Sequence, residues 1–218
     1  FEYMRWIAAV LDSHIQTHLN PDKLRITHLG GGACSLARYC ADVYPNSRNT
    51  VVELDAKLAE YVREWFDIPK SPRVKIRVGD AGTVTRSFAP ASRDVVIRDV
   101  FAVDKTPAEL TSVDFVREVD HSLAPGGLYI LNCGDGPSLD GARAEVAALF
   151  EVFEQVCLVA DAAMLKGRRR GNIIIAASHS PLPAAGSAEA AAISRTLMGG
   201  GVPAQYRDSA QTRQFARL

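Results

Sequence analysis

The sequence has few cysteines, no excess of either charge and no long apolar run. Its four cysteines form no C-x-x-C pair and no cluster with histidine, so neither a disulfide framework nor a zinc site is expected. The 25 basic residues balance the 25 acidic ones, so no basic field would attract nucleic acid or an anionic membrane. Without an apolar run of about 18 residues, no membrane span is predicted. We expect a cytoplasmic protein with reduced thiols and without nucleic-acid or membrane partners.

Length and composition indicate one large globular domain. A chain of 218 residues with 47% hydrophobic and 23% charged residues has the composition of an ordinary folded protein. At this length roughly 70% of the unfolded surface is buried on folding, so no disulfide or metal is needed for stability. The sequence begins at Phe1 and shows no signal-peptide pattern. We therefore expect it to be part of a longer polypeptide.

Short runs rich in valine, isoleucine and leucine alternate with segments of helical period. The expected strands are residues 24–29, 49–54, 74–78, 94–97 and 128–132, followed by two adjacent strands at 156–159 and 172–177. This order predicts an α/β fold: a Rossmann-like, doubly wound, mostly parallel sheet of seven strands with an antiparallel C-terminal hairpin. In such a sheet the ligand lies beyond the carboxyl ends of the strands.

The two ends of the chain differ from this pattern. Residues 1–20 are expected to form a lead-in helix, because their apolar side chains recur at helical spacing. Residues 181–218 are rich in alanine, glycine and serine and offer one helix, at 188–198. We predict a ligand-binding catalytic domain over residues 1–180 and a peripheral helical extension over 181–218.

A glycine-rich turn follows the first expected strand. Gly30, Gly31 and Gly32 allow a sharp turn and a close approach of a ligand to the backbone. Glu53 lies at the end of the next strand, 21 residues after Gly32, a spacing typical of a carboxylate that binds the ribose hydroxyls of a nucleoside. The alternative is that the glycines only allow tight packing of a helix on a strand.

The third and fourth strands also end in aspartates. Asp80, followed by Ala81, could contact an adenine amino group or could simply cap a helix. The turn lacks the last small residue of the dinucleotide fingerprint, which favours an adenosyl ligand without phosphates over NAD. Asp99 would face the reactive end of that ligand, where it could hold a cationic substrate or accept a proton. Its alternative role is that of a loop or cap aspartate.

These blocks resemble the spermidine synthase (polyamine aminopropyltransferase) family, which has the class I S-adenosylmethionine-dependent methyltransferase fold. The resemblance extends over about residues 1–180. It is carried by the blocks Leu29-Gly30-Gly31-Gly32, Val52-Glu53-Leu54-Asp55, Gly79-Asp80-Ala81 and Asp94-Val95-Val96-Ile97-Arg98-Asp99.

The resemblance implies aminopropyl transfer from decarboxylated S-adenosylmethionine to an amine such as putrescine, without a metal. It further implies that Asp99 is the catalytic base and that Tyr3 helps to hold the amine. Asp104 could also hold the amine, but only if its loop shifts, because it lies two residues after the position of the family's aspartate. The donor would be bound by Gly30, Gly31, Gly32, Glu53, Asp80 and Ala81. The partner would be a small-molecule amine, and the chain could form a homodimer.

The sequence departs from the family pattern on the amine side. Ala33 and Ala102 stand where the family has aspartates, and Met4 follows Tyr3 where the family has glutamine or histidine. The resemblance does not include the small N-terminal β-domain of the family. Two alternatives therefore stand beside aminopropyl transfer: methyl transfer from intact S-adenosylmethionine, and a nucleoside-binding family member that has lost catalysis.

Overall fold

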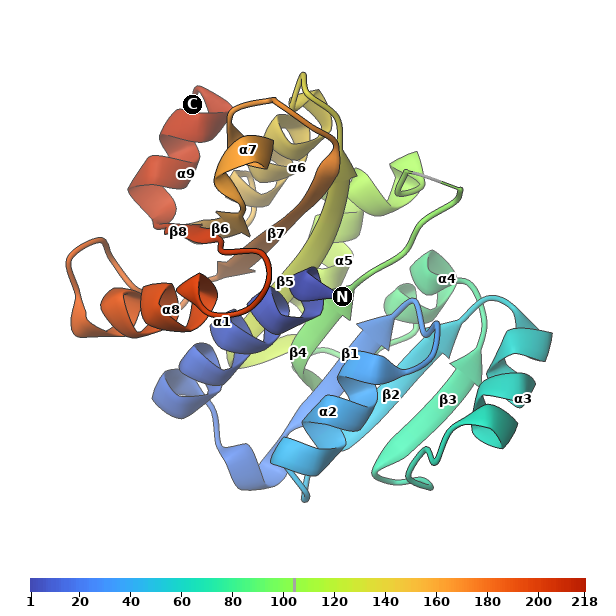
Figure 1. Ribbon diagram of the computed structural model, residues 1–218. Helices are drawn as coiled ribbons and strands as arrows, with labels where there is room; N and C mark the ends of the chain where they lie inside the picture. Colours follow the sequence, from blue (N-terminus) through green and yellow to red (C-terminus); the bar gives the residue numbers. More distant parts are fainter. Residues whose placement is uncertain (104) are drawn as a thin grey trace.

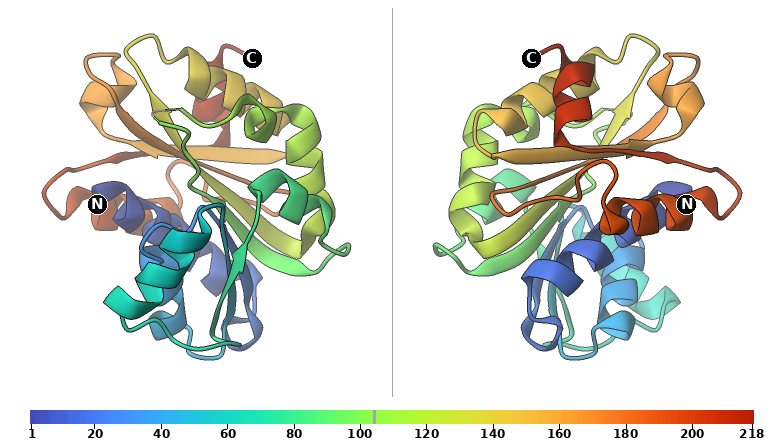
Figure 2. Two further views of the ribbon diagram at one scale, coloured as in Figure 1. Left: turned by 90° about the vertical axis from the view of Figure 1, so that its right-hand side faces the viewer. Right: turned by 90° about the vertical axis from the view of Figure 1, so that its left-hand side faces the viewer.

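A twisted β-sheet runs through the protein, with helices on both of its faces (Figures 1 and 2). The computed structural model describes residues 1–103 and 105–218. The helices are α1 (Glu2–His18), η1 (Pro21–Lys23), α2 (Ser35–Val43), α3 (Ala56–Trp65), α4 (Ala81–Arg86), η2 (Ala108–Thr111), α5 (Val113–Ser122), α6 (Asp140–Phe150), α7 (Ala162–Leu165), α8 (Ala188–Met198) and α9 (Ser209–Ala216). The strands are β1 (Arg25–Leu29), β2 (Arg48–Glu53), β3 (Val74–Val78), β4 (Arg93–Arg98), β5 (Leu123–Asp135), β6 (Gln155–Ala160), β7 (Gly171–Ser178) and β8 (Gln205–Arg207).

In the described residues the sheet has the strand order β3-β2-β1-β4-β5-β7-β6-β8. Strands β1 to β5 pair in parallel, whereas β7 is antiparallel to both β5 and β6. The strand order reverses between β1 and β4, which is where a ligand is expected to bind in a doubly wound sheet. The predicted fold class, including the antiparallel C-terminal hairpin, is confirmed.

The sheet has one strand more than the seven expected. The additional strand, β8, pairs antiparallel with β6 and comes from the C-terminal segment, for which only a helix was predicted. Three residues without an apolar run carry no strand signal, and β8 forms because β6 leaves an edge to pair with. Helix α9 follows it and was not predicted either.

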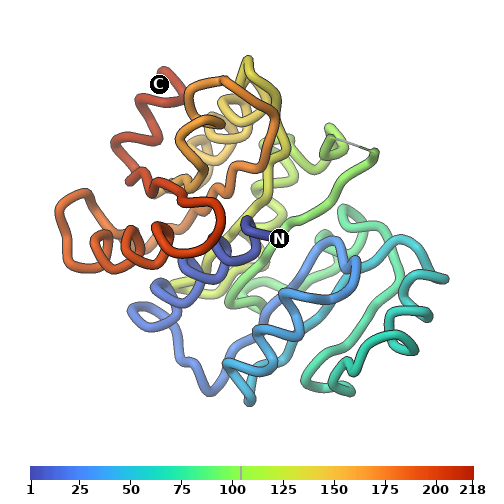
Figure 3. Tube along the Cα trace, viewed as in Figure 1, coloured from blue at the N-terminus to red at the C-terminus, as the bar shows by residue number. Residues whose placement is uncertain are grey.

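Alternate residues of the central strands face two helical layers. One layer contains α4, α5, α6 and α9, and the other contains α1, α2, α3 and α8. Helices α1 and α8 lie side by side although they come from opposite ends of the chain (Figure 3). Because strands of this type are covered on both faces, they read as continuous apolar runs, as residues 95–97 do.

None of the described helices is long and apolar enough to cross a membrane. Within the same residues, no group of three or more histidine, cysteine or acidic side chains is arranged to hold a metal ion.

Candidate functional site

The glycine turn after β1 is held against the end of β4. The N–H of Gly30 donates to the carbonyl of Val52 at 2.9 Å, and its φ of +89° is one that glycine adopts readily. A Cβ at this position would lie 2.8 Å from the carbonyl carbon of Asp99 and would overlap its oxygen. Only glycine therefore allows the turn to approach β4 this closely.

The carboxylate of Glu53 is fixed by the same turn. Its Oε2 accepts hydrogen bonds from the N–H groups of Gly31 at 3.0 Å and Gly32 at 3.1 Å, and its Oε1 accepts one from Asp55 N–H at 3.0 Å. A carboxylate has about four acceptor positions, so one remains for a hydroxyl group. Binding two ribose hydroxyls would require one of the glycine N–H groups to give way.

Asp80 caps a helix. Its Oδ1 accepts the backbone N–H of Thr83 at 2.7 Å at the start of α4, and this hydrogen bond lowers the pKa of the carboxyl group. The capping role that the sequence left open is thus present. A contact between Asp80 and adenine stays a prediction.

Asp99 receives hydrogen bonds from two elements that are distant in sequence. The hydroxyl of Tyr3, on α1, donates to Oδ2 at 2.9 Å, and the Nδ2 of Asn132, on β5, donates to Oδ1 at 2.9 Å. Burial and the adjacent Asp99 charge raise the pKa of Tyr3, so the phenol stays protonated. Each carboxylate oxygen keeps a free acceptor position, which suits it to bind a cationic amine or take a proton.

Two cavities meet at Asp99. The Glu53 cavity, of about 380 Å³, is lined by Glu53, Asp80, Ala81 and the η2 region. The Tyr3 cavity, of about 330 Å³, is lined by Tyr3, the glycine turn and the ends of β4 and β5. Both cavities share Gly30, Gly32, Asp99 and Phe101 as lining residues. Asp99 therefore stands in a wall common to both.

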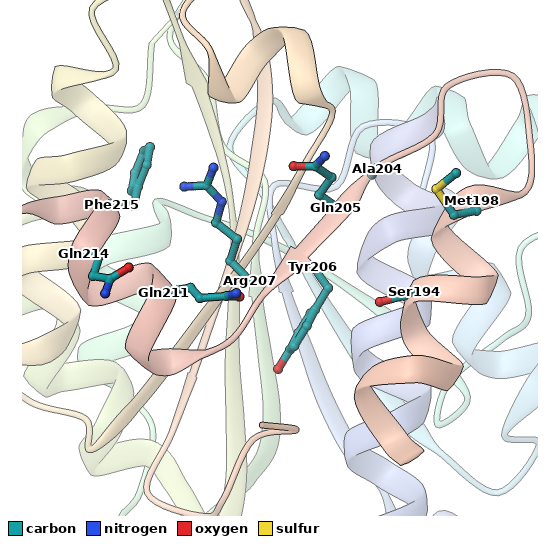
Figure 4. Close-up of a pocket in the computed structure, with 9 residues that line it drawn as sticks. All are labelled: Ser194, Met198, Ala204, Gln205, Tyr206, Arg207, Gln211, Gln214 and Phe215. Atoms are coloured by element: carbon teal, nitrogen blue, oxygen red, sulfur yellow. The ribbon is translucent and has the colours of Figure 1, made fainter. Parts of the chain in front are cut away.

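A larger cavity, of about 650 Å³, lies at the β8 edge of the sheet (Figure 4). It is bounded by α8, β8 and α9, and the side chain of Arg207 extends across it toward Phe215. Among its described lining residues there is no carboxylate, histidine or cysteine that could serve as a base or nucleophile. We therefore place the candidate site at the Glu53 and Tyr3 cavities.

The structure brings the predicted site residues together, except for one that it does not describe. Asp104 lies outside the described residues. The other predicted residues line one or both of the two cavities: Tyr3, Gly30, Gly31, Gly32, Glu53, Asp80, Ala81 and Asp99. Ala33, which stands in place of the family's aspartate, lines the Tyr3 cavity.

Sequence reasoning missed several lining residues. Asn132, Asn172 and Phe101 line the Tyr3 cavity but were not singled out. Asn132 lies on β5, so the rule that ligands bind beyond strand ends could have indicated it. Asn172 and Phe101 carry no comparable signal, because their positions depend on how β7 and the segment after β4 pack.

His28 also lines the Tyr3 cavity, as a buried residue of β1. Its Nε2 is 3.0 Å from Asn49 Oδ1, and burial lowers the pKa of the imidazole to about 4. The side chain is therefore neutral at ordinary pH, as expected for a core histidine.

No protein-family model matches the chain. A probable spermidine synthase from Corynebacterium glutamicum is similar over nearly the whole chain, with 61% identity and a TM-score of 0.97. The alignment covers 99% of this chain and 77% of that protein. Human methyltransferase-like protein 13, solved in complex with SAH, is 25% identical with a TM-score of 0.70, and 92% and 94% of the two chains are covered.

Curated relatives of two kinds match shorter stretches. The mouse eEF1A lysine and N-terminal methyltransferase is 32% identical over 144 residues, which are 61% of this chain and 20% of that protein. The polyamine aminopropyltransferase of Vibrio vulnificus is 26% identical over 51% of this chain and 38% of its own. The chain thus spans only a fifth to two fifths of these proteins. The Corynebacterium match, by contrast, covers more than two thirds of both chains at high identity, and we conclude that the chain belongs to the spermidine synthase family.

Proposed function

We propose that the protein transfers an aminopropyl group from decarboxylated S-adenosylmethionine to a small amine such as putrescine. The observation that carries this proposal is the position of Asp99 in the wall shared by the two cavities. A donor in one cavity and an amine in the other would meet beside this carboxylate. The described residues that line both cavities fall within residues 1–180, which supports this range as the catalytic domain.

The Glu53 cavity suits the adenosyl part of the donor. Glu53 would accept a hydrogen bond from the ribose, and the adenine would lie near Asp80 and Ala81. The glycine N–H groups that hold Glu53 fix the carboxylate in advance, so little ordering is required when the ligand binds.

Asp99 and its partners suit the amine. A primary alkylammonium has a pKa of about 10, so it must lose a proton before its nitrogen can attack. Asp99 would attract the cation and take that proton. The nitrogen lone pair then forms the new N–C bond while the C–S bond breaks, and its electron pair stays on sulfur to give neutral methylthioadenosine.

Tyr3 and Asn132 would orient the base during this step. Both donate to Asp99, one to each oxygen, so the carboxylate plane is fixed between the cavities. Alignment of the two substrates and exclusion of water would supply the rest of the catalysis, since the sulfonium group is itself a good leaving group.

A methyltransferase that uses intact S-adenosylmethionine is the second candidate. Ala33 offers no carboxylate to bind the donor's amine or to repel an additional carboxylate at that position. The likeness to human methyltransferase-like protein 13, which binds SAH, also favours this candidate.

A calorimetric titration with each donor tests the proposal, combined with mass spectrometry of the products formed with putrescine. Preference for the decarboxylated donor and release of methylthioadenosine would support aminopropyl transfer. Preference for S-adenosylmethionine and release of S-adenosylhomocysteine would replace it with methyl transfer. Binding of methylthioadenosine without turnover of either donor would indicate a family member that has lost catalysis.

A further inference from the structure

A fully buried arginine lies directly before Asp99. Arg98 is the last residue of β4, and its side chain enters the layer formed by α5 and α6. One guanidinium nitrogen, Nη2, donates to Oε2 of Glu145 on α6 at 2.5 Å, and the other, Nη1, donates to the carbonyl of Leu110 at 2.5 Å. Arg98 is 0% exposed and Glu145 is 6% exposed. The ion pair is therefore shielded from water.

Stability alone is a weak explanation for this pair. Removing two charges from water costs several kcal/mol for each ion, and replacing a buried pair by apolar residues is often neutral or stabilising. The bond to Leu110 offers a second reason for the arginine, because it reaches a segment that lines the candidate site.

Leu110 belongs to η2, which forms part of the Glu53 cavity. Pro107, Glu109 and Leu110 all line this cavity. The Leu110 side chain is buried and packs close to Gly82 in α4, the helix that Asp80 caps. The position of η2 thus determines the shape of the cavity opposite Glu53.

Asp99 and Leu110 are both held close to the end of β4. The Asp99 N–H donates to the carbonyl of Leu29 at 2.8 Å, and Leu110 is held by Arg98. We infer that Arg98, fixed by Glu145, is a positioning residue that holds η2 against the sheet and so shapes the Glu53 cavity for the adenosyl ligand. This inference rests on the proposed function for the identity of the ligand.

The double variant Arg98→Met/Glu145→Leu tests the inference without leaving an unpaired buried charge. We expect it to fold and to bind methylthioadenosine about tenfold more weakly, which corresponds to the loss of a hydrogen bond from a charged donor. Its kcat at saturating donor should stay within about twofold of the wild type, because Asp99 keeps its own partners. The backbone N–H groups of residues 108–111 should exchange with deuterium about tenfold faster, whereas those of β1 and β2 should not.

Two further variants separate positioning from stability. In Glu145→Gln the amide oxygen can still accept the hydrogen bond from Arg98 Nη2, so Arg98 keeps its position and its bond to Leu110. This variant removes the charge of the pair, so it should lower stability but leave the affinity for methylthioadenosine unchanged. The matched control is Arg25→Met/Asp94→Leu, which removes the ion pair of 2.8 Å near the opposite end of β4. This control should not change the affinity either.

Wild-type affinity together with wild-type exchange at residues 108–111 in the double variant would overturn the inference. If the double variant does not fold, Arg98→Lys replaces it. Lysine can keep the ion pair but lacks the fork that reaches both acceptors, so unchanged affinity and exchange there would also overturn the inference. If the wild type binds no adenosyl ligand, the proposed function fails, while the exchange measurement still decides whether Arg98 positions η2.

Discussion

The Glu53 cavity and the Tyr3 cavity share a wall but are built differently. The Glu53 cavity relies on backbone groups close to strand ends: the N–H groups of Gly31 and Gly32 hold Glu53, and the start of α4 holds Asp80. The Tyr3 cavity relies on side chains from distant elements. The Glu53 cavity is therefore determined by local backbone geometry. The Tyr3 cavity is determined by which side chains the surrounding elements present.

Replacing the shared carboxylate should give the largest effect. We expect Asp99→Asn to lower kcat by about 10²- to 10⁴-fold, because the amide cannot accept a proton from the amine. The affinity for methylthioadenosine should change by less than about twofold, because the contacts of Glu53 are untouched. Steady-state kinetics measures the change in kcat, and calorimetry measures the affinity for methylthioadenosine. A variant with full activity would show that Asp99 is not the base.

Acid should destabilise the protein through two buried histidines, one of which lines the Tyr3 cavity. Burial lowers the pKa of His28 and of His14 to about 4. The unfolded chain therefore binds protons below about pH 6.5 that the folded chain does not bind, so stability falls as the pH falls toward 4.

Between pH 7 and pH 5 the expected loss for the two histidines together is about 4 kcal/mol in the free energy of unfolding. Urea unfolding at several pH values measures it, and the variant His14→Gln/His28→Gln should show a flatter profile. A wild-type profile that is flat over this range would contradict the prediction.

Two glycines of the turn allow the energetic cost of crowding to be measured separately from the cost of backbone strain. Gly30→Ala should lower the free energy of unfolding by about 3 kcal/mol, since its Cβ would overlap the Asp99 carbonyl and φ is positive. Gly32→Ala should cost about 1 kcal/mol, because φ is +47° but no atom lies within 4 Å of the added Cβ. Urea unfolding compares the two variants, and equal losses would show that crowding at Gly30 is relieved.

Changing the Glu53 cavity should affect the nucleoside alone. Glu53→Gln should weaken methylthioadenosine binding by about 5- to 100-fold, because a charge-assisted hydrogen bond is lost. Glu60→Gln, which makes the same change at an exposed residue of α3 outside the cavity, serves as the matched control and should leave the affinity unchanged. Calorimetry with methylthioadenosine measures both variants. Wild-type affinity in Glu53→Gln would refute the assignment of the nucleoside site.

The strand ends were the most predictable part of the site. Buried parallel strands read as apolar runs, and the residues that follow them meet at one edge of the sheet, so Glu53, Asp80 and Asp99 could be grouped from the sequence. Their contacts were less predictable. Asp80 could cap a helix or bind adenine, and the same sequence pattern serves either role.

Features that depend on tertiary pairing were not predictable. Strand β8 has three residues and forms on the edge of β6, so it has no local signal. Tyr3, which only the family resemblance placed in the site, comes to Asp99 from 96 residues away, and Asn132 comes from 33 residues away. Glu145 comes to Arg98 from 47 residues away. Such pairs are created by the packing of α1 and α6 on the sheet, and no local pattern encodes them.

The contact between Gly30 and the carbonyl of Asp99 also constrains how descendants of this protein can diverge. Residue 30 cannot acquire a side chain without displacing the backbone of the segment that bears Asp99. We therefore expect the distance between the glycine turn and Asp99 to be preserved for as long as residue 30 stays glycine. Substitutions on α1 and in the part of the Tyr3 cavity away from Asp99 do not change this distance. We therefore expect the amine substrate to change more readily in evolution than the adenosyl co-substrate.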